Sequence, residues 1–173
     1  PWAGGPDDRA LEVADESGQT LADHLLWQLE LAPLGERERD IGRAIVDAVN
    51  DDGYVTDSLA DIAATLAPEI EASEAEIEAV LGIVQAFDPA GVGARSVAEC
   101  VDLQLAQLDP STPGLGRARE IARNHLQLVA DQGYAVLRRQ LACTAEELEE
   151  ALLLVRGCHP RPGSVLQRSD TEY

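Results

Sequence analysis

The stretch Ser73–Gly93, SEAEIEAVLGIVQAFDPAGVG, contains one helix with a marked beginning and end. Ser73 followed by Glu76 has the spacing of a capping box, which predicts a helix start. A buried stripe with the 3.6-residue helical period follows at Ile77, Val80, Leu81 and Val84. Phe87-Asp88-Pro89 should end the helix, because a residue before proline is disfavoured in the α region. We therefore expect a half-buried helix that ends in a turn containing Gly91 and Gly93.

The same pattern returns 71 residues later without a gap. Thr144 and Glu147 repeat the capping box, and Cys158-His159-Pro160 takes the place of Phe87-Asp88-Pro89. The second apolar stripe is Leu148, Ala151, Leu152 and Val155. Gly53-Tyr54 precedes the first copy and Gly133-Tyr134 the second. Helices often share start and stop signals by chance, which can produce part of this likeness. The gapless match nevertheless favours two units with related packing.

The composition predicts helices. The chain has 173 residues, enough for one or two small domains, and 45% of them are apolar but only 3% aromatic. A core of Leu, Ile, Val and Ala favours α-helices. No run reaches the ~18 apolar residues of a membrane span, and no signal peptide is visible. Three scattered cysteines fit neither a disulfide framework nor a zinc site. We expect a cytoplasmic protein with no membrane contact, and a piece of a longer chain because residue 1 is not methionine.

The net charge of −19 is unevenly distributed. Residues 1–110 contain 24 acidic residues and five arginines, whereas residues 111–173 contain eight of each. An acidic surface is repelled by phosphate backbones and attracted to basic protein surfaces. The charge therefore argues against DNA binding by this chain alone and favours a protein partner.

The pattern of caps and stops predicts an all-α fold of about eight helices in two small bundles. The expected helices follow the caps Thr20, Ser58, Ser73, Ser96 and Thr144, with two more at about Glu36–Val49 and Leu115–Asp131 and a short one ending at Leu141. We expect an acidic flexible linker over residues 1–18. The Pro/Gly-rich break after Leu108 places the first bundle at 19–110 and a three-helix, helix-turn-helix-like bundle at 111–173.

No catalytic, cofactor or metal site is expected. Gly91-Val92-Gly93 resembles a nucleotide-binding loop only superficially, because such loops follow a strand. Cys158-His159 is adjacent in sequence, without a third partner for catalysis. His125 lies on the apolar side of its expected helix. The abundant carboxylates are typical of solvated helix faces and capping charges.

Two arginines beside the proline–glycine turns have two open interpretations. Arg95 could form an ion pair with Asp88 and stabilise the turn. It could equally contact a partner, because an arginine on a rigid turn is a common interface anchor. The same alternatives apply to Arg161.

Four segments together resemble the core-binding region of bacterial sigma-54 factors, the enhancer-dependent sigma subunits of RNA polymerase. These segments are DHLLWQLEL (23–31), NDDGYV (50–55), FDPAGVGARSVAEC (87–100) and HPRPG (159–163). The resemblance covers about residues 19–168. His159 departs from it, since the family usually has aspartate there.

The resemblance implies a non-enzymatic module that binds core RNA polymerase. It also implies that promoter DNA and the activator ATPase contact parts of the full factor outside this chain. We expect the main organising, partner-binding site at Asp88, Pro89, Gly91, Gly93 and Arg95, supported by Gly53 and Tyr54. The equivalent corner of the second unit is Pro160, Arg161 and Gly163. The alternative is a DNA-binding helix-turn-helix formed by the last two helices, although its recognition helix would carry Glu146, Glu147, Glu149 and Glu150.

Overall fold

The computed structural model describes residues 19–163. Within this range the chain forms nine α-helices, and its only β-type pairings are two isolated bridges. The all-α prediction is confirmed. None of these helices is long and apolar enough to cross a membrane. The helices are α2 Leu21–Leu31, α3 Glu36–Asp47, α4 Leu59–Leu66, α5 Glu74–Val84, α6 Val97–Ala106, α7 Leu115–Asn124, α8 Leu126–Ala130, α9 Tyr134–Leu141 and α10 Ala145–Arg156.

Five of these helices begin at the predicted side-chain caps. The hydroxyls of Thr20, Ser58, Ser73, Ser96 and Thr144 each accept a hydrogen bond from the backbone N–H three residues on. The reciprocal bond of a full capping box forms at Thr20 and Thr144. At Ser73 the Glu76 carboxylate instead accepts a hydrogen bond from Arg37, with 2.6 Å between Nε and Oε1.

The first lobe comprises α2 to α5 and the turn after α5, residues 19–94. Its main core lies between α3, α4 and α5. The predicted stripe of α5, Ile77, Val80, Leu81 and Val84, is buried there. Val92, in the turn after α5, packs with Leu25 of α2 and Val46 of α3, so the turn belongs to this lobe.

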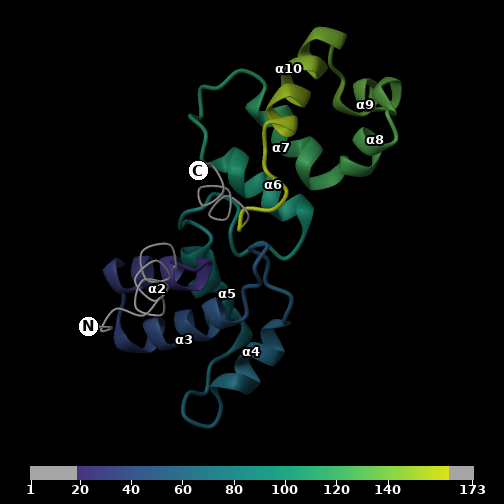
Figure 1. Cartoon of the computed structure of the whole chain (residues 1–173). Helices are drawn as coiled ribbons and strands as arrows, with labels where there is room; N and C mark the ends of the chain where they lie inside the picture. Colours follow the sequence, from purple (N-terminus) through teal and green to yellow (C-terminus); the bar gives the residue numbers. More distant parts are fainter. Residues whose placement is uncertain (1–18, 164–173) are drawn as a thin grey trace, which may run out of the picture.

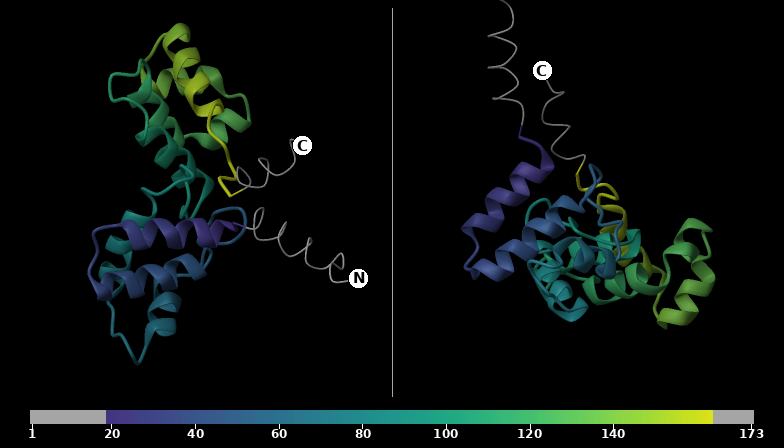
Figure 2. Two further views of the ribbon diagram at one scale, coloured as in Figure 1. Left: turned by 60° about the vertical axis from the view of Figure 1, so that its left-hand side comes forward. Right: turned by 90° about the horizontal axis from the view of Figure 1, so that it is seen from below.

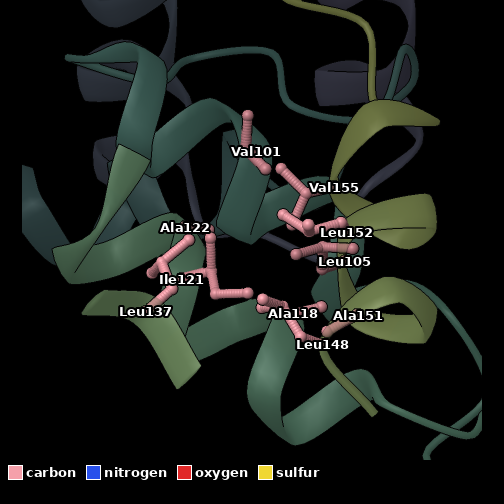
Figure 3. Packing of buried hydrophobic residues seen from close by; sticks show 10 residues of the cluster. All are labelled: Val101, Leu105, Ala118, Ile121, Ala122, Leu137, Leu148, Ala151, Leu152 and Val155. Atoms are coloured by element: carbon pink, nitrogen blue, oxygen red, sulfur yellow. The ribbon is translucent and has the colours of Figure 1, made fainter. Parts of the chain in front are cut away.

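The second lobe comprises α6 to α10, residues 95–163, and Figures 1 and 2 show it as a separate group of helices. Figure 3 shows Val101 and Leu105 of α6 facing Leu152 and Val155 of α10. The predicted stripe of α10 is buried in this core. Leu137 is the buried contribution of α9.

The packing of α6 differs from the boundary that the sequence suggested at residue 110. The first bundle was expected to span 19–110, yet α6 packs against α7 and α10. Periodicity indicates that one face of a helix is buried but not which core it enters. The Pro/Gly-rich break at 109–114 is thus a loop inside the second lobe. The predicted linker at 1–18 lies outside the described residues.

Two further details of the second lobe differ from expectation. The long helix expected at Leu115–Asp131 is interrupted at His125, whose φ of −134° and ψ of 17° separate α7 from α8. Val97 and Leu108 share the helical spacing of the buried Val101 and Leu105, but 52% and 40% of their surfaces are exposed. Val97 is the first residue of α6, and Leu108 lies two residues past its last residue, Ala106, so both are at the margins of the core.

The burial of α6 predicts a contrast between two leucines. Leu105→Ala should lower the free energy of unfolding by ~2–5 kcal/mol, because it removes a fully buried side chain from the second core. Leu108→Ala should change it by about 0.5 kcal/mol or less, because that side chain is already exposed. Urea unfolding followed by circular dichroism measures both. Equal losses in the two variants would contradict the described packing of α6.

Candidate functional site

The sequence-predicted site residues come together where the two lobes meet. We call this region the lobe junction and define it as residues 50–55, 88–95 and 159–163. The Gly93 N–H donates to the Gly53 carbonyl at 2.8 Å, and the Val55 N–H donates to the Ala94 carbonyl at 3.0 Å. The chain after α10 runs back toward the first lobe (Figure 1), where the Gly163 N–H donates to the Asp52 carbonyl at 3.0 Å.

Two glycines make this close approach possible. Gly53 has a φ of +96°, in the left-handed region that glycine adopts without strain, and a Cβ at this position would lie 2.8 Å from Pro162 Cγ. A Cβ on Gly163 would overlap the backbone carbonyl of Asp51. Both glycines are buried. Their role in the structure is to let backbone pack against backbone.

Tyr54 joins the lobes by its side chain. Its hydroxyl donates a hydrogen bond to the Pro160 carbonyl at 2.5 Å. Burial, and then a hydrogen bond with Cys100, raises the pKa of Tyr54 above its ordinary value. The phenol therefore keeps its proton at neutral pH and remains a donor.

A glutamine holds each proline turn by its backbone. Gln28 of α2 donates from Nε2 to the Asp88 carbonyl at 2.7 Å, and the Asp88 N–H donates to Gln28 Oε1 at 2.8 Å. Gln104 of α6 makes the same pair with His159, at 2.6 Å and 2.7 Å. Asp88 and His159 are the equivalent positions of the 71-residue repeat, so the two units share this clamp.

These glutamines were missed by reasoning from the sequence. Each lies eight positions after the N-cap of its helix, Thr20 for Gln28 and Ser96 for Gln104. An alignment of α2 with α6 on their N-cap residues places Gln28 and Gln104 at the same position, and this signal is present in the sequence. The repeat was instead recognised from α5 and α10, which do not contain the clamping residue.

Arg95 pairs with two glutamates rather than with the expected Asp88. Its Nη2 lies 2.9 Å from Glu99 Oε2, and its Nη1 lies 3.3 Å from Glu78 Oε1. Burial opposes ionisation of Glu99, but hydrogen bonds from the side chain and backbone of Arg95 outweigh it and lower the pKa of Glu99. Gln85 adds to this network by donating to Glu99 Oε1 and to the Gly93 carbonyl, each at 3.0 Å.

The ten predicted positions divide into an inner and an outer set. Gly53, Gly91, Gly93 and Gly163 are buried, whereas Tyr54 and Pro89 are half-buried. The exposed members are Asp88, Arg95, Pro160 and Arg161. The Arg161 N–H donates to His159 Nδ1 at 3.1 Å, which orients the end of the turn.

The Cys158 thiol, which immediately precedes the junction segment 159–163, has the properties of a packing group. Burial, and then the neighbouring Cys100, raises the pKa of the Cys158 thiol to about 11. A protonated thiol is a poor nucleophile. Over residues 19–163, no group of three or more His, Cys, Asp or Glu side chains could hold a metal ion. The arrangement of these residues holds the two helical lobes together and leaves the outer surfaces of the lobes exposed.

If the two glutamines hold the proline turns, replacing either one should lower stability and loosen the turn that it holds. Gln28→Ala should cost about 1–2 kcal/mol of stability, because two hydrogen bonds to the first turn are lost. Amide hydrogen exchange should speed up at Asp88 in this variant and at His159 in Gln104→Ala. Each variant serves as the control for the other. Unchanged exchange at both positions would contradict the clamp.

Comparison with known proteins adds to this geometry. A family model described as "Sigma-54 factor, core binding domain" matches residues 10–173. The RNA polymerase sigma-54 factor of Pseudomonas aeruginosa is 41% identical over 96% of this chain and 34% of its own length. That of Escherichia coli K12 is 41% identical over 96% of this chain and 35% of its own length. That of Xanthomonas euvesicatoria is 43% identical over 91% of this chain and 33% of its own length.

The chain spans about a third of the length of these curated relatives. The family match covers both lobes and the junction between them. The chain belongs to the sigma-54 factor core binding domain family.

Proposed function

We propose that this chain binds core RNA polymerase as the core-binding part of a sigma-54 transcription initiation factor. The observation that carries the proposal is the family match over residues 10–173, which includes every helix of both lobes. The module acts by protein–protein contact and is not an enzyme. Promoter DNA and the activator ATPase would contact parts of the full factor outside this chain.

The charge distribution supports a basic protein surface as the partner of the first lobe. Residues 19–94 contain 16 acidic residues and three arginines, a net charge of −13. Residues 95–163 contain nine acidic residues and eight arginines, a net charge of −1. The first lobe would therefore gain most from electrostatic attraction. We also propose that the two structural units divide after Ala94.

A helix-turn-helix function of α9 and α10 is not favoured. The helix in the recognition position, α10, carries Glu146, Glu147, Glu149 and Glu150 in its first half. Phosphates and base edges would repel this end of the helix.

Within the junction, the exposed members are the proposed polymerase contacts and the buried ones the scaffold. Asp88, Arg95, Pro160 and Arg161 are accessible to a partner, whereas the four buried glycines hold the backbone. Arg95 is the most informative of these, because one substitution can show whether it contacts a partner or only stabilises the turn.

A direct binding experiment tests the function. The 173-residue chain, immobilised through one terminus, should retain purified core RNA polymerase at low salt and more weakly at moderate salt, because screening reduces attraction of the acidic lobe. Salt-dependent duplex DNA binding should be absent. Failure to retain the polymerase under both salt conditions would refute the proposal.

Arg95→Ala separates interface from scaffold. We expect affinity for core polymerase to fall by ~10-fold or more, as for an interface arginine. Thermal stability should change little, because exposed ion pairs contribute about 0–1 kcal/mol. Arg117→Ala is the control, since Arg117 pairs with Glu147 within the second lobe, away from the junction, and should leave affinity unchanged. Lost stability with unchanged affinity would assign Arg95 to the scaffold.

A further inference from the structure

The outer face of α2 carries two large apolar side chains that nothing in the described structure covers. Trp27 is 57% exposed and Leu31 is 66% exposed. They lie four positions apart, so they occupy one stripe of the helix. α2 forms an outer edge of the first lobe (Figure 2). This stripe is therefore accessible to a partner along its length.

The opposite face of the same helix is firmly fixed. Leu25 and Leu29 are fully buried. Leu29 packs so closely on Gly42 of α3 that a Cβ there would lie 2.6 Å from Leu29 Cδ1. Gln28 is bonded to both backbone groups of Asp88. The stripe is thus presented on a rigid support, and a partner need not order it on binding.

His24 restrains the tryptophan itself. The two rings stack with 6.3 Å between their centroids and an interplanar angle of 17°. A large aromatic side chain held in place at a surface is the residue type most enriched among interface hot spots.

The negative charge of the first lobe, to which the stripe belongs, favours a partner with a basic surface. Two of the three arginines of the first lobe have their charge matched by carboxylates, Arg37 by Glu76 and Arg43 by Glu30 and Asp40. The lobe as a whole carries a net charge of −13. An apolar stripe in an acidic surface complements an apolar pocket with basic residues around it.

We propose that the Trp27–Leu31 stripe is the anchor by which the first lobe docks on core RNA polymerase, with the Trp27 indole seated in an apolar pocket of a basic polymerase surface. The proposal rests on the proposed function and adds to it the contacting surface and its chemistry. Its two residues, Trp27 and Leu31, do not belong to the lobe junction.

Substitution at the stripe tests this directly, because exposed side chains can be changed without disturbing the core. Trp27→Ala should weaken the equilibrium affinity of the 173-residue chain for purified core polymerase by ~10-fold or more, and Leu31→Ala should weaken it to a smaller extent. Trp27→Phe should retain part of the affinity. Leu153→Ala is the control, since this leucine is 64% exposed on α10 and should leave affinity unchanged.

The outcomes separate this proposal from the function on which it rests. Wild-type binding with an unchanged Trp27→Ala affinity overturns the anchor and leaves polymerase binding intact. No binding by the wild-type chain overturns both. Sedimentation of the chain alone tests the other occupant: a dimer that Trp27→Ala abolishes would assign the stripe to self-association and overturn the proposal. Equal melting temperatures of the variants would show that the affinity loss is not unfolding.

Discussion

The arrangement of the two lobes depends on backbone hydrogen bonds made by one short segment, Asp52–Val55. Within the first lobe it pairs with Gly93 and Ala94, and toward the second lobe its Asp52 carbonyl accepts a hydrogen bond from the Gly163 N–H and its Tyr54 hydroxyl donates one to the Pro160 carbonyl. These bonds require that no side chain intervene at 53 and 163. The ion pairs nearby are largely exposed, and such pairs contribute too little to set the orientation of two helical groups. Sterically permitted backbone contact, rather than charge, is therefore the main constraint on the junction.

The repeat explains why the two proline turns can differ in sequence. Gln28 and Gln104 bind the backbone N–H and C=O of Asp88 and His159, and neither clamp uses the side chain of the residue that it holds. Histidine can therefore replace aspartate at the second turn without loss of the clamp. An ion pair between Asp88 and Arg95 is not needed at the first turn either, because Arg95 pairs with Glu78 and Glu99.

Local features of the fold were predictable from sequence, and non-local ones were not. The five caps and both buried stripes follow from residues three or four positions apart, so a short window contains the whole interaction. The lobe to which α6 belongs depends on α7 and α10, which its own sequence does not reveal. The break at His125 has no proline or glycine to mark it. The sequence predicted two equivalent corners, one in each unit, but not that they lie together. The glutamines that hold the two turns come from helices 60 and 55 residues away in sequence.

α2 connects the interior of the first lobe with its surface. Its inner side contains Leu25, Leu29 and the Gln28 clamp, and its outer side contains Trp27 and Leu31. Trp27 and Gln28 are adjacent on this helix, and Gln28 is hydrogen-bonded to the backbone of Asp88, so no loop lies between the exposed indole and the first proline turn. The chain continues from that turn through Gly93 and Ala94 into the second lobe, which begins at Arg95. A partner bound to Trp27 would therefore lie one residue from the side chain that holds the first proline turn of the junction.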